Sequence, residues 1–522
     1  MLKQHIEAFR ADLQEFYDMT EKFYCKEITV PEYKGFSGGF GSYAQRGGEC
    51  SMLRLRLPAG EVDKDKLKFI ADSIEKYQID MAHLTTCQTI QFHNLTKDTV
   101  CSLIKEAMDH GIITRGGGGD FPRNVMCSPL SGVEREEYFD VVPYAKESGD
   151  YLLGFIGKVK LPRKLKVCFS SNGKNETHAT FRDLGFVAKE NGKFDVYAAG
   201  GLGIKPKLGV QVVEDLAPSK VLYVVKTMVD VFTKHGNYTQ RAASRSRFLQ
   251  DTLGVEKLQK IFKEKLEENL AKEDLDIPEE TFAAYENANV KEKAEKVKGE
   301  KVKENVKVVS QKQEGLYAVS YHPIGGVPEI TFFYQLYEVI KDMEEVKLRL
   351  TPDQGMYVVN LSASEVEKVL PLMADDEGTG FERSTACIGA DICQVGIGKS
   401  TLMLREIAKR VKSEHFSNGV LPAIHISGCP SSCAAHQTAV IGLRGGKKQT
   451  ADGPKDAFAI YENGSDKQGK EAFGEELGVM TVEDIPEFFV ELGRAIQEKE
   501  MTYMQFRKEY PEKIKEIAGR FM

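Results

Sequence analysis

Four of the ten cysteines of this chain lie close together in its C-terminal third. Cys387 and Cys393 are separated by five residues, and Cys429 and Cys433 by three. Thiolates grouped in this way usually bind a metal or carry out redox chemistry. Structural zinc is one alternative, but zinc cysteines are typically about two to four residues apart within each pair, so the first spacing is unusual for zinc. A 4Fe-4S cluster takes four cysteine thiolates and is larger than a zinc ion, so the spacing favours a cluster, with unliganded thiols as a third alternative.

The other six cysteines are scattered, and we expect each of them to be a small buried hydrophobic residue. Ten cysteines in 522 residues are too few for a disulfide scaffold. The scattered set is Cys25, Cys50, Cys87, Cys101, Cys127 and Cys168.

Composition and charge exclude several classes of protein. The longest apolar runs, such as residues 221–225, are far too short to cross a bilayer. Ile6, Phe9, Leu13 and Phe16 have helical spacing, and acidic residues among them argue against a signal or transit peptide. We therefore expect a cytoplasmic protein. A net charge of −7 gives no basic surface for nucleic acid.

Two segments of the chain resemble each other. Residues 82–95 (AHLTTCQTIQFHNL) and 348–361 (LRLTPDQGMYVVNL) share five identities at a constant offset. A helical pattern precedes and follows each segment, so each copy predicts helix, strand, loop, strand and helix. The sequence thus predicts an α/β (α+β) fold built from two related halves. Residues 291–307 between the copies are nearly all Lys, Glu and Val, which favours a solvated connector or an exposed helix.

The cysteine pattern, with the G-C-P-x2-C order around Cys429 and Cys433, resembles the cluster motif of the sirohaem-dependent sulfite and nitrite reductases. Further segments resemble blocks of the same family in the same order, and the resemblance extends over about residues 30–520, including the duplication. These segments are 52–60, 85–95, 123–129 and 161–169.

This resemblance implies a pseudo-twofold fold of two ferredoxin-like half-domains and two domains that bind sirohaem and the cluster. The expected divisions are an N-terminal segment with the first half-domain over 1–135, the first sirohaem-binding domain over 136–285, a charged linker over 286–312, the second half-domain over 313–380, and the 4Fe-4S and sirohaem-binding domain over 381–522.

The resemblance also implies an activity, the six-electron reduction of sulfite to sulfide or of nitrite to ammonia. It assigns Cys387, Cys393 and Cys429 to the cluster, and it makes Cys433 the thiolate shared by the cluster and the sirohaem iron. Ser431 stands where the family usually has Asn, a departure that would change hydrogen bonding beside the cluster.

Four cations correspond to the anion pocket of the family, namely Arg54, Arg123, Lys164 and Lys166. Cationic side chains offer charge-assisted hydrogen bonds to an oxyanion. Lys164 and Lys166 are two residues apart and so lie on the same face of a strand. We expect the lysines to be the proton donors, because the pKa of lysine shifts readily and that of arginine does not.

Sirohaem carries eight carboxylates, and burying them requires many hydrogen-bond donors. By resemblance, the candidates are His83, Thr85, Thr86, Gln91 and His93, while Cys433 would contact the cofactor through its iron. Cys87 stands at a position where the family usually has arginine, so one carboxylate contact is missing or comes from elsewhere, with His83 and Arg46 as alternatives. Three further arginines could contact the carboxylates or form an exposed basic helix face: Arg241, Arg245 and Arg247.

The second lysine bears on the choice of substrate. Family members of the sulfite group have K-x-K here, whereas plant-type nitrite reductases have Asn at the second position. Lys166 therefore favours sulfite, with nitrite as the alternative. A third reading, kept open by Cys87, is an iron–sulfur protein or a zinc-stabilised binding module that has lost sirohaem.

We expect an external electron donor, ferredoxin or a separate flavoprotein. The sequence has no second cysteine set for a ferredoxin domain. Neither GGLGIKPKLG at 200–209 nor GIGKS at 396–400 fits a nucleotide-binding fingerprint in full.

Overall fold

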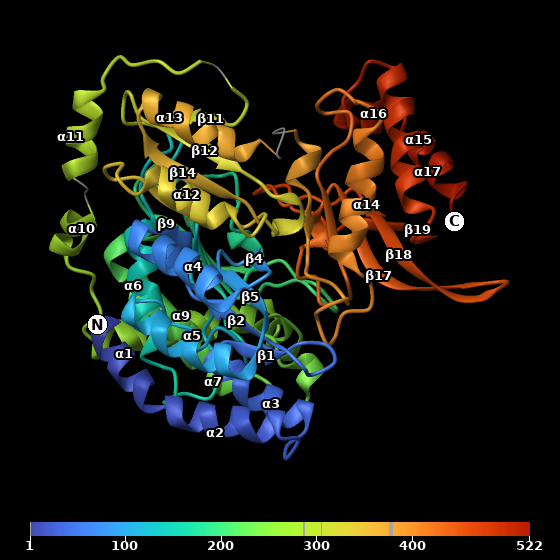
Figure 1. The fold of residues 1–522 in the computed structure, drawn as a ribbon. Coiled ribbons are helices and arrows are strands. Elements are labelled where there is room, and N and C mark those ends of the chain that lie inside the picture. The colour runs from blue at the N-terminus through green and yellow to red at the C-terminus, as the bar shows by residue number, and fades with distance from the viewer. Residues whose placement is uncertain (1, 286–287, 304, 375–378) are drawn as a thin grey trace.

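Three buried cores organise the computed structural model, which describes residues 2–285, 288–303, 305–374 and 379–522. The first core combines side chains from Phe9–Ile156 with side chains from Val319–Met373. The two half-domains, which the sequence predicts as separate segments, thus share one core. The second core is built mainly from residues 125–277 and the third from residues 386–518, which form the orange-to-red lobe of Figure 1.

The N-terminal residues form helices α1 (Leu2–Ala11), α2 (Leu13–Tyr24) and α3 (Val30–Ser37), drawn in dark blue in Figure 1. The predicted helical spacing is confirmed, since Phe9, Leu13 and Phe16 are buried. The helix is interrupted at Asp12, so the apolar stripe is shared by two helices.

The two sequence repeats form two matching sheets. In the first, β1 (Ser42–Ala44), β2 (Ser51–Leu55), β5 (Ile90–Leu95) and β4 (Ala82–Leu84) lie in that order, and the helices of this repeat are α4 (Lys64–Tyr77) and α5 (Lys97–Asp109). In the second, the order is β11 (Val308–Ser310), β12 (Tyr317–Tyr321), β14 (Met356–Leu361) and β13 (Lys347–Leu350), with helices α12 (Phe332–Ile340) and α13 (Ala363–Val369). The predicted order of elements is confirmed in both copies.

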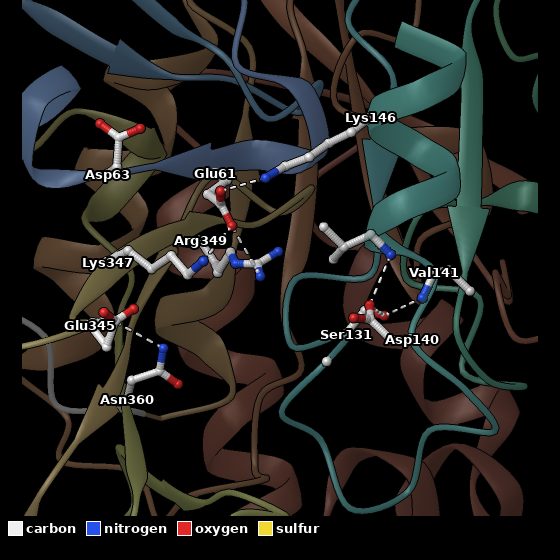
Figure 2. Close-up of polar contacts among 12 residues, drawn as sticks. Glu61, Asp63, Ser131, Asp140, Val141, Lys146, Glu345, Lys347, Arg349 and Asn360 are labelled. Carbon is white, nitrogen blue, oxygen red and sulfur yellow. Dashed lines mark hydrogen bonds and ion pairs between the residues drawn. The ribbon is translucent and has the colours of Figure 1, made fainter. Parts of the chain in front are cut away.

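A short strand of the first half completes the sheet of the second. Strand β3 (Glu61–Val62) pairs antiparallel with β13. Glu61 is only 12% exposed and forms ion pairs with Lys146 at 2.6 Å, Lys347 at 3.0 Å and Arg349 at 3.2 Å, as Figure 2 shows. Burial alone would raise the pKa of Glu61, but the three cations outweigh burial and hold the pKa well below its ordinary value. This carboxylate therefore joins the halves electrostatically.

The other two domains also match each other. Each sheet has three parallel strands followed by two antiparallel ones. The first contains β6 (Met126–Cys127), β7 (Val167–Ser170), β8 (Leu184–Ala188), β9 (Phe194–Ala198) and β10 (Val210–Leu216). The second contains β15 (Thr385–Ala386), β16 (Ile424–Ser427), β17 (Ile441–Thr450), β18 (Gly453–Glu462) and β19 (Glu475–Thr481).

Helices complete both domains. The first has α6 (Val142–Leu153), α7 (Val221–His235), α8 (Leu249–Leu253), α9 (Val255–Lys272) and α10 (Glu279–Tyr285), and the second has α14 (Ser400–Lys412), α15 (Ile485–Glu498), α16 (Tyr503–Glu509) and α17 (Pro511–Gly519). Among the described residues, no helix is both long and apolar enough to cross a membrane.

The charged segment between the halves is more than a solvated connector. It contains helix α11 (Ala288–Lys296), one face of which packs against Leu316. The buried ammonium group of Lys293 forms an ion pair with Glu365 at 2.7 Å. The alternative of an exposed helix is therefore confirmed for most of α11, and the exceptions are the buried residues Val290, Lys293 and Ala294. Residues 286, 287 and 304 of the expected linker lie outside the described residues.

Candidate active site

A cavity of about 320 Å³ lies where the repeats and the two larger domains meet. Thr86 lines it from the first repeat and Asp353 from the second, each in the turn between the two strands of its hairpin. Lys164 and Lys166 line it from the segment before β7, and Cys433 lines it from the segment after β16. Both expected half-domains and both larger domains thus contribute to one space.

The two lysines reach the cavity together, as their alternation predicts. They flank Leu165, which forms a parallel bridge with Pro122, in an extended segment that ends where β7 begins. Desolvation, together with the nearby charges of Arg245, Arg123 and Lys166, lowers the pKa of Lys164 well below its ordinary value. Such an ammonium group releases a proton more readily than an exposed one.

The two arginines of the expected anion pocket lie beside the cavity and are not among its lining residues. Both bind the glycine-rich segment 116–119. Arg123 donates to the carbonyl oxygens of Gly117 at 2.8 Å and Gly119 at 2.7 Å, and Arg54 also donates to Gly117. The buried Nε of Arg123 has no hydrogen-bond partner among the described residues. The structure therefore brings the lysines into the cavity and holds the arginines on backbone carbonyl groups next to it.

The cluster cysteines surround the ends of two adjacent parallel strands. Cys387 directly follows β15 and accepts a hydrogen bond on its sulfur from the Gly428 N–H at 3.1 Å. The loop that carries Cys393 folds back, and the N–H groups of residues 397 and 398 both donate to the Gly428 carbonyl oxygen at 2.8 Å. A Cβ at Gly428 would lie 2.6 Å from the Gly398 oxygen, so this close approach requires glycine. The loop, Cys387 and Cys429 are thereby held around one turn.

The four cysteine thiols are the type of donor that a 4Fe-4S cluster takes. All ten cysteines are free thiols, and Cys433 interacts electrostatically with Cys387, Cys393 and Cys429. Within the part of the chain that the structure describes, no three His, Cys, Asp or Glu side chains are grouped so that they could hold a metal ion. Four thiolates around a cube of iron and sulfide are spread more widely than four ligands of one zinc ion.

The matching domain has no thiols at the corresponding positions. The Ser128 N–H donates to the Phe169 oxygen at 3.0 Å, as the Cys387 N–H donates to the Ile426 oxygen at 3.0 Å. Ser128 therefore corresponds to Cys387, and the acceptor Phe169 corresponds to Ile426. Asn172 and Cys429 each lie three residues after their acceptor, so these two residues also correspond. The two domains share a backbone design, and the cluster ligands belong to the second.

The remaining sirohaem candidates are divided between the cavity and the interior of the first sheet. Thr86 donates its hydroxyl proton to the Cys433 oxygen at 3.0 Å, whereas Thr85 bonds Thr89 within the turn at 2.6 Å. The other three are buried: His83 lies 2.7 Å from the Gln354 amide nitrogen, Gln91 reaches His83 at 3.3 Å, and His93 reaches Gln45 at 3.2 Å. None of these three lines the cavity, so their contact with a cofactor stays a prediction.

Arg46, an alternative donor for the missing carboxylate contact, binds the cysteine loop instead. Its guanidinium donates to the carbonyl oxygens of Cys393 at 3.1 Å and Gly396 at 2.7 Å, and its backbone N–H donates to Ile392 at 2.9 Å. In this structure Arg46 therefore supports the loop around Cys393.

The three arginines of residues 241–247 have different surroundings: Arg241 and Arg247 lie in 3₁₀ turns, and Arg245 is extended just before the second turn. Arg245 lines the cavity, pairs with Asp183 at 2.9 Å and has an unpartnered buried Nε among the described residues. Arg241 pairs with Asp120 at the surface, and Arg247 binds the Ile204 oxygen at 2.7 Å. The alternative of one exposed basic helix face is therefore wrong.

Cys87 is half-buried beside the cavity, where it packs against Met126 and Cys168. Burial alone would raise the pKa of its thiol, but the charges of Lys166, Arg182 and Arg54 lower it to about 6. Among the other scattered cysteines, Cys127 and Cys168 are buried as expected. Cys25 is exposed, so the expectation of burial is wrong for that residue.

Several cavity residues escaped the sequence argument, namely Glu176, His178, Arg182, Asp353, Arg383, His425 and Asp466. Asp353 could have been found, because the repeat offset makes it the counterpart of Cys87. Glu176 corresponds to Cys433 in the other domain. The residue before each of them, Asn175 and Ser432, has a left-handed backbone conformation. The cavity is thus cationic beside Lys164 and carries carboxyl groups on its other walls.

Comparison with known proteins matches two family models in chain order. Residues 43–110 match the nitrite/sulfite reductase ferredoxin-like half domain, and residues 118–270 match the nitrite and sulphite reductase 4Fe-4S domain. The second match covers the domain that contains Ser128 and Asn172, not the one with the four clustered cysteines.

Similar curated proteins divide between two substrates. The chain is 25% identical to sulfite reductase [ferredoxin] 2 of Mycolicibacterium paratuberculosis, over 88% of this chain and 80% of that protein. It is 27% identical to the chloroplastic ferredoxin–nitrite reductase of Zea mays, over 77% and 70%, and 28% identical to the assimilatory ferredoxin-dependent nitrite reductase of Haloferax mediterranei, over 78% and 73%. The solved structure of the Mycobacterium tuberculosis NirA protein matches the fold with a TM-score of 0.76 at 22% identity, covering 94% of this chain and 91% of that one.

Proposed function

This chain belongs to the nitrite and sulfite reductase family, and we propose that it reduces sulfite to sulfide with a 4Fe-4S cluster and sirohaem as its cofactors. One observation carries the proposal, namely that Lys164, Lys166 and Cys433 line the same cavity. The lysines would lie where the oxyanion binds, and Cys433 would connect that place to the cluster.

In this proposal Cys387, Cys393, Cys429 and Cys433 would hold the cluster, and Cys433 would also hold the sirohaem. The donor chemistry of the cavity supports sirohaem, because Arg182 and Arg245 line it and the buried Ser432 hydroxyl and Arg245 Nε, which also line it, lack partners among the described residues. When bound, the two cofactors would pass electrons from the external donor to the substrate.

The side chains supply binding and protons. Lys164 and Lys166 bind the oxyanion by charge-assisted hydrogen bonds. The lowered pKa of Lys164 suits it to give a proton to an oxygen that leaves as water. Arg54 and Arg123 contribute positive charge from the Gly117 side. Thr86 holds the backbone of Cys433.

We infer sulfite as the first substrate because two lysines favour a dianion over a monoanion. Nitrite is the alternative, supported by relatives named as nitrite reductases. An iron–sulfur protein without sirohaem is a third alternative, and it rests on Cys87. We propose ferredoxin as the electron donor, as in the names of the relatives, with a flavoprotein as the alternative. We also propose a cytoplasmic location.

The experiment is turnover of the protein purified without oxygen, with reduced ferredoxin, sulfite and nitrite in parallel assays for sulfide and ammonium. We expect Lys164→Met to reduce turnover by about 100-fold, the lower end of general acid catalysis. The matched control is Lys160→Met, which changes an exposed lysine of the same segment. Formation of neither product by the wild-type protein, or equal turnover in both variants, would contradict the proposal.

A further inference from the structure

Arg182 is a cation of the cavity wall that has hydrogen-bond donors to spare. It directly follows the 3₁₀ turn Ala179–Phe181 of the first larger domain and lines the cavity. Its Nε donates to the Thr177 oxygen at 3.0 Å, and its Nη2 lies 3.5 Å from Nδ1 of His178. Its Nη1 has no hydrogen-bond partner, and its charge no carboxylate partner, among the described residues. The guanidinium can therefore bind an anion in the cavity.

His178 fixes the direction of this guanidinium. Arginine has no acceptor atom, so it can only donate to Nδ1, and the neutral imidazole then carries its proton on Nε2. Nε2 lies 3.2 Å from the carboxylate of Asp466, in the second larger domain, and donates to it. The ring of Phe181 stacks on the imidazole with the centroids 4.7 Å apart. Burial lowers the pKa of His178, which agrees with a neutral ring.

Asp466 is itself held in place by the first larger domain. The side-chain amide of Asn175 donates to the backbone oxygen of Asp466 at 2.7 Å and to the Thr180 hydroxyl at 2.9 Å. Asn175 and His178 both have left-handed backbone conformations, with φ of 58° and 60°. A chain of contacts thus runs from Asp466 through His178 to Arg182, and it joins two domains at the cavity wall.

Arg182 lies next to the hairpin turn that lacks its expected arginine. Cys87 stands at that position, and it packs against a hydrophobic cluster that contains Ala179, three residues before Arg182. Thr86, the neighbour of Cys87, lines the same cavity as Arg182. Of the two substitutes that the sequence suggests, Arg46 binds the cysteine loop and His83 does not line the cavity. The nearby cavity cation is therefore the one on the adjacent turn.

Resting on the proposed function for the identity of the cofactor, we propose that Arg182 binds a carboxylate of sirohaem and so replaces the arginine that the family carries at the position of Cys87. A planar guanidinium offers parallel N–H donors to a carboxylate, which a lysine does not. His178 acts through Arg182 and is a positioning residue, and Asp466 fixes the tautomer of that histidine.

The test measures release of sirohaem from the holoenzyme during repeated ultrafiltration, read as haem absorbance in the filtrate. We expect Arg182→Gln to release sirohaem about 10- to 100-fold faster than the wild type, because hydrogen bonds to a charged carboxylate are lost. Arg405→Gln, which changes an exposed arginine on α14, should release it at the wild-type rate. Equal rates for the two variants would overturn the assignment.

A double variant tests the replacement itself. Adding Cys87→Arg to Arg182→Gln should slow the release back toward the wild-type rate, because the carboxylate regains a guanidinium from the hairpin turn. Thermal unfolding shows whether the double variant keeps the stability of Arg182→Gln. No recovery at an unchanged melting temperature would overturn the replacement.

Two substitutions of His178 separate positioning from stability. His178→Asn keeps an acceptor near the place of Nδ1 and loses the bond to Asp466, whereas His178→Gln keeps a donor near the place of Nε2 and loses the acceptor for Arg182. We expect His178→Gln to release sirohaem about 3-fold faster, the effect of one hydrogen bond, and His178→Asn to stay near wild type. The melting temperature should fall more in His178→Asn. Faster release in the less stable variant would overturn the positioning role.

Binding of sulfite, followed by the optical change of the haem, separates this assignment from a contact with the substrate. If Arg182 holds the oxyanion instead, Arg182→Gln keeps its sirohaem and binds sulfite more weakly, and that result would overturn the assignment. A holoenzyme that reduces neither anion, but loses sirohaem faster in Arg182→Gln, would contradict the proposed function and leave the carboxylate contact intact.

Discussion

Gln88 and Gln354 occupy equivalent turns of the two repeats, and each reaches into the other half of the molecule. Gln88 donates to the Leu350 oxygen at 2.7 Å, and Gln354 donates to the Leu84 oxygen at 3.4 Å. Both residues have left-handed backbone conformations, with φ of 52° and 73°. Gln88/Gln354 and Leu84/Leu350 are both identical pairs of the sequence repeat. These two identities therefore preserve a reciprocal contact across the pseudo-twofold axis.

Gln354→Leu should destabilise the protein by about 2–4 kcal/mol, because buried backbone groups lose their partners. The side-chain amide of Gln354 donates to the Ala386 carbonyl oxygen at 2.9 Å and accepts from the Ala386 N–H at 2.9 Å. Ala386 directly precedes Cys387. Thermal unfolding compared with the exposed control Gln449→Leu measures the effect. Equal melting temperatures for the two variants would refute this role.

Glu61→Gln should cost about 3–5 kcal/mol near pH 7, since it leaves three cations around a neutral amide. A carboxyl group whose pKa is depressed in the folded state contributes its full stabilisation of that state above its unfolded pKa of about 4.3. This contribution is lost as the pH falls through the folded-state pKa. The difference in melting temperature between wild type and Glu61→Gln should thus be constant above about pH 5 and shrink at lower pH. A difference that grows on acidification would show that the pKa of Glu61 is not depressed.

Arg46→Ala should weaken the loop around Cys393, because two carbonyl oxygens lose their donor. We expect iron to be lost to a chelator several-fold faster than from the wild type, and Arg46→Lys to restore part of the resistance. Arg405→Ala, which changes an exposed arginine on α14, is the matched control. If Arg46→Ala and Arg405→Ala release iron at the same rate, Arg46 does not support the loop.

Cys393→Ser should abolish the iron–sulfur absorption and the acid-labile sulfide, because a cube needs its four thiolates. Cys25→Ser changes an exposed thiol remote in sequence from the motif and should keep both. Iron and sulfide analysis of the two purified variants makes the comparison. Full retention of sulfide in Cys393→Ser would remove this residue from the ligand set.

Much of the fold could be predicted because its signals are local. Helix and strand periodicity around residues 82–95 and 348–361 predicts the two hairpins, and spacing groups the four cysteines. The family resemblance implies the duplication of the two larger domains, but no residue pattern reveals it, since Ser128 and Cys387 share a backbone hydrogen-bond pattern and not a residue type.

The site was only partly predictable, because several contacts join segments that are far apart in the sequence. Arg46 reaches Cys393 across 347 residues, and nothing around either residue indicates the contact. Burial lowers the pKa of Lys166, and the charges of Cys87 and Arg182 act on it from other segments of the chain. A motif assigns Lys166 a position, but its burial and its charged neighbours become evident only in three dimensions.

The most direct test of the central claim is the absorption spectrum and metal content of the wild-type protein purified without oxygen. If Cys433 joins a cluster to sirohaem, the spectrum has a haem Soret band with a long-wavelength band, and chemical analysis finds iron with acid-labile sulfide. A featureless spectrum with zinc as the bound metal would contradict the account.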